Sequence, residues 1–524
     1  MCLRKNPLKW FWSYIYGIKG LFLILYTIFI FSTFLFVIID DTTYLLKYVF
    51  LTIAASAALV PQVIKLLKGI SVTPKRISET GKVEMRWKVF FVVVPLLILL
   101  AKLLIYYPDL PIDSHVQYLQ AMNNEYNDWH PVTHTLVFFK LPLLMTNGWI
   151  GSIYLFQAVL FSLVLGYSFY TIRKVSNTKY SIIAFLFVLL NPELTNIVLF
   201  PWKDIAFAIG ALLLMTYALN IYYSSGNWIK KPLNLILFCV VFSLTTLFRH
   251  NALLFTVPLL IAIFFLIPVK RTISVVLCVL VLIAGIKVPL YSALNVESPD
   301  KRQVETLGFP MTVIGACITY APDKLDEETR DFAYKVAPKD VWEEKYSYGD
   351  FNNVKFHEKT NMNVIEEYGT GKIMSMTLKC IACCPKESIK GMICLTEPVY
   401  TVSDNYLFYE IPKNDPSSAN GFHGIPFLQN LLTKLSIGIF VIFPWLFMYI
   451  GSMHYTLLAS AAAKCSLRKR EHRKKLLLIL PVFTYNFGTS LLLTGAGDSS
   501  RFFFYTFLLM PALIVLLYRK EETA

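Results

Sequence analysis

Several residues able to do chemistry lie in one polar stretch of an otherwise apolar chain. Residues 107–149 contain the segment PDLPIDSHVQYLQAMNNEYNDWHPVTH, which holds Asp113, Asp128 and His130. A carboxylate beside a hydroxyl can take its proton, and a histidine can orient or polarise the same group. We therefore take Asp113, Asp128 and His130 as the catalytic candidates.

Cationic and polar side chains also occur where other apolar segments end. Lys203 and Asp204 stand in PWKD, Arg249 and His250 in FRHN, and Arg501 in GDSSR. Basic side chains can hold a phosphate leaving group and stabilise its developing charge. These five residues are the candidates for binding substrate and phosphate. With the acids of the loop, they suit transfer of a group from a phosphorylated lipid.

Each of these residues also has a structural interpretation that the sequence leaves open. Asp113 and Asp204 can cap helices through their side-chain oxygens. Lys203 and Arg249 can anchor helix ends among lipid headgroups. His130, directly before a proline, can be a buried histidine with its hydrogen bonds satisfied. The functional interpretation depends on all of them meeting at one place.

The amino-acid composition predicts the kind of secondary structure that positions these candidate residues. The 524 residues are 56% hydrophobic and only 16% charged, whereas soluble domains carry about 25% charged residues. This excludes a soluble enzyme, a disordered chain and a disulfide scaffold, and it indicates an all-α polytopic membrane protein. Twelve apolar runs approach the roughly 20 residues that a membrane helix needs. They are 21–39, 43–64, 89–106, 150–171, 180–199, 204–222, 233–248, 251–269, 273–291, 435–452, 476–494 and 502–518.

The basic residues predict the orientation. With about twelve transmembrane helices, the positively charged connections all fall on one side, and the positive-inside rule makes that side the cytoplasm. The net charge of +15 is then a topology signal, not a sign of a nucleic-acid partner. Both termini are expected in the cytoplasm. Residues 132–146 are apolar but contain Lys140 and Pro142, so we expect an interfacial or re-entrant helix on the outer side.

Four regions follow from this topology. Residues 1–88 form accessory transmembrane helices and a cytoplasmic loop, and residues 89–291 form a transmembrane core with its first external loop at 107–149. Residues 292–432 form an extracytoplasmic domain of mixed or mostly helical structure, with 14 Lys+Arg against 20 Asp+Glu. Residues 433–524 return to the membrane as the last three helices. Within 107–149, residues 114–126 are expected to lie on the membrane as an amphipathic helix.

The external domain holds the only cluster of cysteines, namely Cys380, Cys383, Cys384 and Cys394. The first three share one face of a helix. Zinc binding, a disulfide that includes Cys394, and simple packing of small apolar side chains all stay open, and packing is favoured because paired CxxC spacing and a nearby histidine are missing.

Two motifs resemble the GT-C superfamily of polytopic membrane glycosyltransferases, which includes the protein O-mannosyltransferases and the aminoarabinose transferases. The first is the acid soon after a membrane helix, followed by an amphipathic helix, here Asp113 in PIDSHVQYLQ and then NDWHP. The second is NPELTNIVLFPWKDIAFAIGALLL, where a helix ends near a proline and Asp204 opens the next one. The resemblance covers roughly residues 89–291, and it points to uncharacterised bacterial members.

The resemblance implies a glycosyltransferase of the plasma membrane that uses a polyprenyl-phosphate sugar. Asp113 would be the catalytic base, with Asp128 as its alternative, and Lys203, Arg249 and Arg501 would hold the donor phosphate. The acceptor would be an envelope glycan, a lipid or a protein. Two helices precede the usual first one, and the loop lacks a DxD pair. A divalent cation shared by the two acids stays open.

Two other functions remain as alternatives. An envelope polysaccharide polymerase or ligase would rely on late arginine and histidine residues, here His250 and Arg501. A transporter or flippase would place ionisable groups near the middle of the membrane and show repeated halves. The candidates here gather instead at helix ends, which favours glycosyl transfer.

Overall fold

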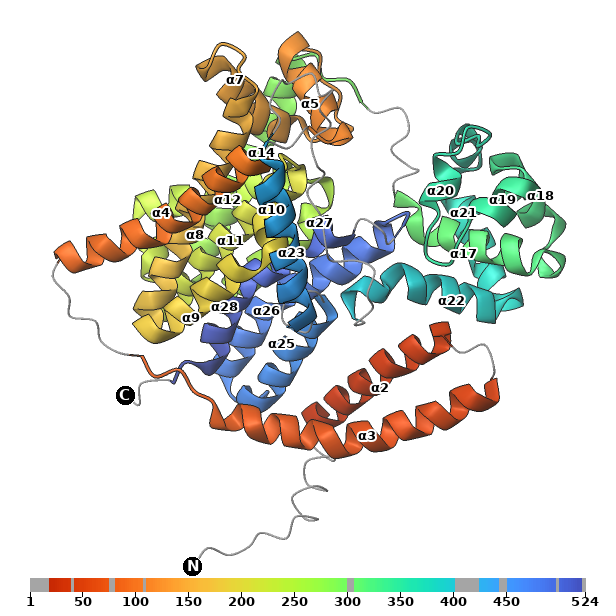
Figure 1. The fold of residues 1–524 in the computed structure, drawn as a ribbon, viewed down its shortest axis with the longest axis horizontal. Coiled ribbons are helices and arrows are strands. Elements are labelled where there is room, and N and C mark those ends of the chain that lie inside the picture. Colours follow the sequence, from red (N-terminus) through yellow and green to blue (C-terminus); the bar gives the residue numbers. More distant parts are fainter. Residues whose placement is uncertain are drawn as a thin grey trace, which may run out of the picture.

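The computed structural model describes residues 18–38, 42–74, 81–106, 110–298, 306–400, 424–442, 450–495 and 499–520. Within these ranges the chain is helical, with no strand beyond isolated bridges. Figure 1 shows a bundle of long helices with a smaller helical domain beside it. The two termini, which we expect in the cytoplasm, lie outside the described residues.

The bundle consists of long apolar helices and of short helical segments between them. They are α2 (Ile18–Ile38), α3 (Thr42–Gly69), α4 (Gly81–Tyr106), α8 (Gly151–Val175), α9 (Thr178–Leu190), α10 (Pro192–Ile197), α11 (Lys203–Tyr223), α12 (Pro232–Leu247), α13 (Leu253–Phe264), α14 (Val269–Gly285), η4 (Ile286–Leu290), α15 (Tyr291–Ala293), α23 (Pro426–Ile442), α25 (Ile450–Lys464), α26 (Arg470–Leu492), α27 (Ser499–Phe503) and α28 (Tyr505–Tyr518). Short turns η2 (Trp228–Lys230) and η3 (His250–Ala252) join some of them.

Seven described helices are long and apolar enough to cross a membrane. They correspond to seven of the twelve predicted spans, and four other predicted spans overlap shorter apolar helices. One predicted span, 180–199, is interrupted because α9 ends at Leu190 before the Asn191–Pro192 pair, and α10 restarts there. Another, 435–452, is described only at its two ends, in α23 and α25, and its middle part lies outside the described residues. The structure therefore supports a multi-pass membrane protein and leaves the number twelve unconfirmed.

Several predicted basic connections meet at one end of the bundle, which we call the basic end. The Lys464 ammonium donates to the carbonyls of Lys68 and Ile70. The Val72 amide donates to the Tyr518 carbonyl over 2.9 Å, and the Asn177 amide group donates to Thr73. Arg519 lies over the Tyr223 ring at the end of α11. These contacts bring the ends of α3, α8, α11, α25 and α28 together.

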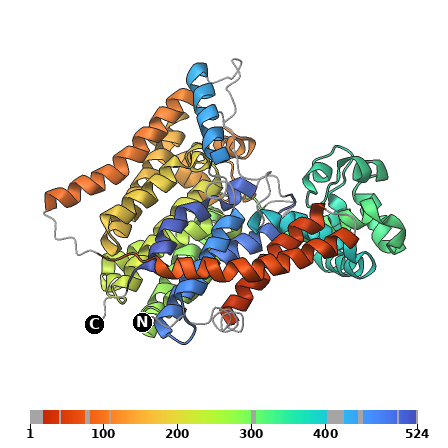
Figure 2. The ribbon, with the colours of Figure 1, turned by 60° about the horizontal axis from the view of Figure 1, so that its bottom comes forward.

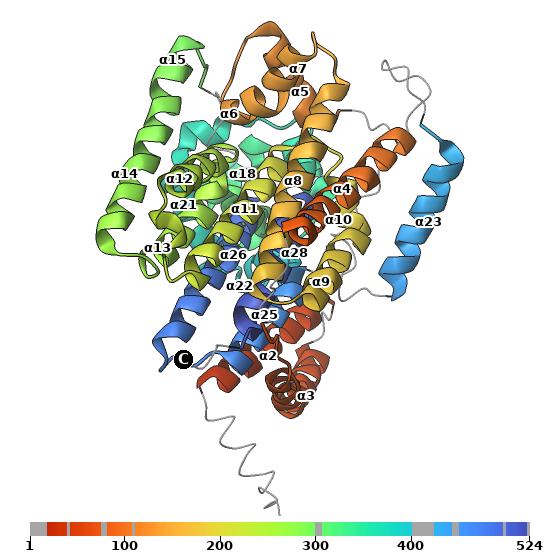
Figure 3. The same cartoon turned by 90° about the vertical axis from the view of Figure 1, so that its left-hand side faces the viewer.

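The first long loop folds at the opposite end. It forms α5 (Ile112–Asn123), α6 (Val132–His134), the π-helical turn η1 (Thr135–Lys140) and α7 (Leu141–Met145). Figure 3 shows these helices near α15, far from α25. The Lys140 ammonium donates to the Ala121 carbonyl over 2.8 Å, which joins η1 to α5. Val116, Leu119 and Met122 are exposed on α5, as a helix lying on a membrane surface requires.

Residues 306–400 form a separate helical domain with its own apolar core. Its helices are α17 (Gly308–Tyr320), η5 (Pro322–Lys324), α18 (Glu327–Val336), α19 (Lys339–Lys345), α20 (Asn352–Lys355), α21 (Asn363–Cys383), α22 (Pro385–Thr396) and η6 (Glu397–Val399). Figure 2 shows it projecting to one side of the bundle. It meets the end of α26, where the Phe351 amide donates to Thr494 and the Thr494 hydroxyl donates to Asn352.

The cysteines of this domain are free thiols in the structure. Cys380 and Cys384 lie in the apolar core, and the Cys317 thiol lies 3.3 Å from the Ser388 hydroxyl. The Cys383 and Cys384 sulfurs lie 3.5 Å apart. These positions fit the packing interpretation of the cluster, because small apolar side chains fill the space between α17, α21 and α22.

Candidate functional site

Five separate segments bring the predicted site residues to one end of the bundle. The start of α5 supplies Asp113, and the turn before α6 supplies Asp128 and His130. The start of α11 supplies Lys203 and Asp204, the turn between α12 and α13 supplies Arg249 and His250, and α27 supplies Arg501. Each of the eight residues contacts at least one other member or a partner shared with one.

Asp113 faces Arg501 across a gap between the first loop and α27. The guanidinium of Arg501 donates to Oδ2 of Asp113 over 3.3 Å, and the two side chains are 20% and 34% exposed. Burial raises the pKa of Asp113, but Lys203, Arg501 and His130 together lower that pKa below its usual range. Asp113 is therefore a charged, partly accessible carboxylate at neutral pH. No side-chain capping bond forms at the start of α5, where Pro111 is the N-cap.

His130 pairs with Lys203. The Lys203 ammonium lies 3.1 Å from Nδ1 of His130, whose side chain is buried. Burial and the nearby Lys203 charge lower the pKa of His130 to about 3. His130 is therefore neutral at physiological pH, with Nδ1 accepting from Lys203 and Nε2 carrying the proton. That leaves Nε2 as a hydrogen-bond donor for a polar partner.

Asp128 has a different environment from Asp113. Its Oδ2 accepts from the Lys287 ammonium over 2.9 Å, and its Oδ1 accepts from the Tyr291 hydroxyl over 3.1 Å. Its backbone amide donates to Glu297, and its carbonyl accepts from Nε2 of His250 over 3.0 Å. Asp128 therefore ties the first loop to η4, α15 and η3. Two side-chain donors from other segments thus hold the Asp128 carboxylate in place.

Arg249 and Asp204 form a buried ion pair between α11 and the end of α12. The guanidinium of Arg249 lies 4.6 Å from the centre of the Phe502 ring. Asp204 does not cap α11, because Trp202 is the N-cap of that helix. The charge of Arg249 is thus compensated inside the protein. The phosphate-binding role of Arg249 stays a prediction, and in this structure its guanidinium is bound to Asp204.

Arg501 also lies close to the ring of Phe502. Its guanidinium lies 4.8 Å from the Phe502 ring centre and 5.4 Å from that of Trp202. Two arginines thus share Phe502, one buried and paired with Asp204, the other directed to Asp113. Aromatic faces attract cations, so this ring helps hold both guanidiniums in place.

Two polar residues inside apolar helices shape the turn before α11, and sequence reasoning missed them both. The Gln157 amide of α8 donates to the carbonyls of Val198 and Phe200, each over 2.8 Å. The Lys102 ammonium of α4 donates to Thr195 and Asn196, each over 2.6 Å. A polar side chain within an apolar membrane run is costly unless it is used, and this was the available signal.

A metal centre is not evident among these side chains. In the described part of the chain, no group of three or more His, Cys, Asp or Glu side chains is placed to hold a metal ion. Asp113 and Asp128 are each bound to a different cationic side chain, Arg501 and Lys287. In the described part of the chain, Asp113 and Asp128 therefore do not belong to a group of side chains that could hold one metal ion between them.

The fold and the apolar helices define a multi-pass α-helical membrane protein with a polar cluster at one end of its bundle. Comparison with known proteins takes this no further. No family model matches the chain, and no curated protein and no solved structure is detectably similar to it.

Proposed function

We propose that this chain is an integral-membrane glycosyltransferase that moves a sugar from a polyprenyl-phosphate donor to an envelope acceptor. The observation that carries the proposal is the pairing of Asp113 with Arg501 beside Lys203 and His130. A charged carboxylate next to two cations is the arrangement that a base and a phosphate leaving group require together. The proposal includes the finer architecture: about twelve spans arranged as in the GT-C superfamily, with the site on the outer side of the plasma membrane.

The proposed reaction is a single displacement at the anomeric carbon. The acceptor oxygen forms a bond to that carbon while the bond from the carbon to the phosphate oxygen breaks. The electron pair of the broken bond leaves with the lipid phosphate, and the acceptor proton passes to Asp113. The leaving group is already an anion, so no strong acid is needed. Lys203 and Arg501 would stabilise its charge.

Arg501 links the two halves of this chemistry. In the structure its guanidinium touches Asp113, and a bound phosphate would compete with that carboxylate for the same donors. Donor binding would then draw Arg501 towards the phosphate and free Asp113 to accept a proton. His130, neutral and with a donor at Nε2, would orient the acceptor hydroxyl. Asp128 and the Asp204–Arg249 pair would hold the surrounding segments.

The test is Asp113→Asn in the purified full-length protein, reconstituted in vesicles and offered a panel of labelled polyprenyl-phosphate hexoses. Asparagine keeps a hydrogen bond to Arg501 but cannot take a proton. We expect turnover to fall by about 10²–10⁴-fold, the usual contribution of a general base. Glu125→Gln is the matched control, because Glu125 is an exposed acid of the same loop, and its turnover should stay at the wild-type level. Full activity of a folded Asp113→Asn protein would end the proposal.

The polymerase or ligase alternative predicts a different ranking. His250 donates to the Asp128 carbonyl, and Arg501 contacts Asp113, so both of its expected catalytic residues lie in the same site. Under that alternative, His250→Gln and Arg501→Gln would abolish glycan extension while Asp113→Asn left it intact. Under our proposal Asp113→Asn is the most damaging, and His250→Gln acts only through the position of the loop.

A further inference from the structure

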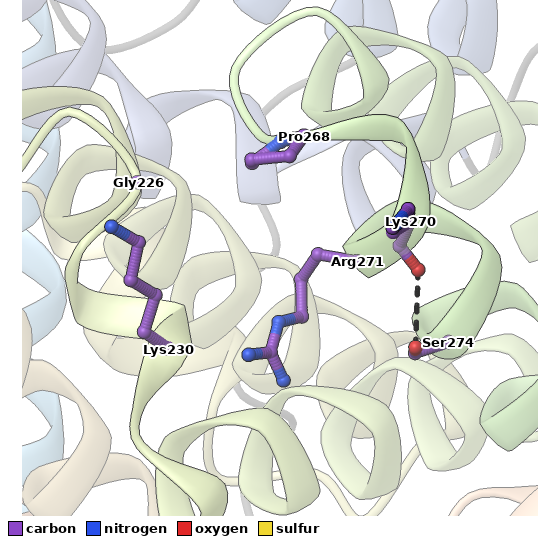
Figure 4. A pocket seen from close by; sticks show the side chains of 6 residues that line it. All are labelled: Gly226, Lys230, Pro268, Lys270, Arg271 and Ser274. Atoms are coloured by element: carbon purple, nitrogen blue, oxygen red, sulfur yellow. Dashed lines mark hydrogen bonds between the residues drawn. The ribbon is translucent and has the colours of Figure 1, made fainter.

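A second polar feature lies at the basic end, about 30 Å from the candidate site, since α11 places 21 residues at about 1.5 Å each between the two ends. It is a pocket of about 420 Å³ lined by Gly226, Lys230, Pro268, Lys270, Arg271 and Ser274. Figure 4 shows Lys230 on one wall and the first turn of α14, with Lys270 and Arg271, on the other. The pocket thus lies between the α11–α12 and α13–α14 connections.

The cations of this pocket have no acidic partner in the part of the chain that the structure describes. Lys230 and Lys270 are exposed and Arg271 is half-buried, and within the described residues none of the three forms an ion pair. The sequence explains this, because residues 205–296 contain no Asp or Glu at all. Three like charges around one space repel each other, and a bound anion would remove that cost. The start of α14 adds the positive potential of a helix N-terminus.

Backbone and aromatic features fix the walls of the pocket. Gly226 has a φ of 81°, and its amide donates to the Ile221 carbonyl, closing the end of α11. The Ser274 hydroxyl donates to the Lys270 carbonyl over 3.1 Å in the first turns of α14. Trp228 packs against Tyr217 next to this connection. Tryptophan and tyrosine beside basic residues are typical of the membrane interface, at the depth of lipid headgroups.

We propose that this pocket binds the phosphodiester headgroup of an anionic phospholipid, in the leaflet opposite the candidate site. Lys230 and Arg271 would contact the phosphate from the two walls, and Lys270 would add charge at the rim. The acyl chains would run along α14, whose outer face is apolar and exposed at Ile273, Leu277 and Leu280. This binding is independent of the proposed glycosyl transfer.

The experiment measures binding of an acyl-labelled fluorescent phosphatidylglycerol to the purified full-length protein in maltoside micelles, by fluorescence anisotropy. Labelled phosphatidylcholine is the zwitterionic comparison. Each Lys230→Gln, Lys270→Gln or Arg271→Gln change should weaken phosphatidylglycerol binding about fivefold, the factor that about 1 kcal/mol per basic residue gives near an anionic surface. The triple variant should lose on the order of a hundredfold. Lys179→Gln is the matched control, because Lys179 is an exposed cation of α9 outside the pocket, and it should bind as wild type.

The possible outcomes separate the sources of the anion. Selective phosphatidylglycerol binding that only the pocket variants lose, and that millimolar inorganic phosphate does not displace, supports the proposal. Displacement by inorganic phosphate would assign the pocket to a free anion and overturn the lipid proposal. Equal losses in the pocket variants and Lys179→Gln would mean general attraction to the basic end, which would also overturn it. Equal thermal unfolding midpoints in all variants show that the comparison is between folded proteins.

Discussion

The two ends of the bundle differ in whether their cationic side chains are paired with acids. At the candidate-site end, cations and acids are paired over short distances: Arg249 with Asp204, Lys287 with Asp128, and Arg501 with Asp113. At the basic end, Lys230, Lys270 and Arg271 have no acidic partner among the described residues. Charges at the candidate-site end are therefore neutralised by ion pairs within the protein, whereas the cations at the basic end can bind anions from outside it.

This difference separates two uses of charge in a membrane protein. Paired, partly buried charges hold side chains in fixed positions and are screened little by salt, as a site for chemistry requires. Unpaired surface cations attract anionic headgroups and are screened strongly. The same residue types therefore mean different things at the two ends, and substitutions at matched positions should show this.

The largest expected effect is on stability at the candidate-site end. Arg249→Gln would leave the Asp204 carboxylate buried without its partner, and we expect a loss of about 3–5 kcal/mol in the free energy of unfolding. Arg271→Gln at the basic end should change it by less than about 0.5 kcal/mol. Thermal unfolding of both variants in detergent measures the contrast.

A double variant sharpens this first prediction. Asp204→Asn combined with Arg249→Gln removes both charges, so it should recover most of the stability lost in Arg249→Gln alone. If the double variant were as unstable as the sum of the single ones, the pair would not be an interacting unit, and the contrast between the two ends would lose its main example.

The second effect is the contribution of His130 to the dependence of stability on pH. Burial and Lys203 lower the pKa of His130 to about 3, whereas an unfolded histidine has a pKa of about 6.5. Between these values the unfolded state binds a proton that the folded state does not, so stability falls as the pH drops from 6.5 towards 3. His130→Asn should make this decline shallower, as measured by unfolding midpoints across that range. An unchanged slope would show that His130 is not buried beside Lys203.

A third and smaller effect distinguishes the two acids of the first loop. Asp128→Asn would weaken the bonds from Lys287 and Tyr291, and we expect a loss of about 1–3 kcal/mol in stability. Asp113→Asn, at a more exposed position, should cost less stability but far more activity. The reverse ranking, with activity depending mainly on Asp128, would move the catalytic base to the second acid.

The sequence predicted which segments lie close together better than it predicted the contacts between their side chains. Long apolar runs and basic connections are enough to put the first loop and several helix ends on one side, because the helices alternate in direction. The pairing of Arg249 with Asp204, and the shared Phe502 ring, depend on how α11, α12 and α27 are rotated and packed. Hydrophobic runs alone carry no such information, so the sequence can predict a phosphate-binding role for Arg249 but cannot predict its ion pair with Asp204.

Helix boundaries show the same limit. The helical conformation is disfavoured for a residue that precedes proline, so Asn191–Pro192 indicates a helix break. The long apolar run 180–199 nevertheless predicts one continuous span. Gln157 and Lys102 were hidden in the same way, as single polar residues inside apolar segments. Gln157 binds backbone carbonyls of the turn before α11, and Lys102 binds the side chains of Thr195 and Asn196 in α10; only the packed structure brings these partners within reach.

The smallest expected effect is the response to salt, and it tests the contrast between the ends directly. Raising the ionic strength from about 0.1 M to 1 M shortens the screening length from about 10 Å to 3 Å. Phosphatidylglycerol binding at the basic end should then weaken several-fold, whereas the stability difference between wild type and Arg249→Gln should change little, because that ion pair is buried. Equal salt sensitivity of the two measurements would mean that water reaches the Asp204–Arg249 pair as freely as it reaches the pocket, and the division of charges between the ends would not hold.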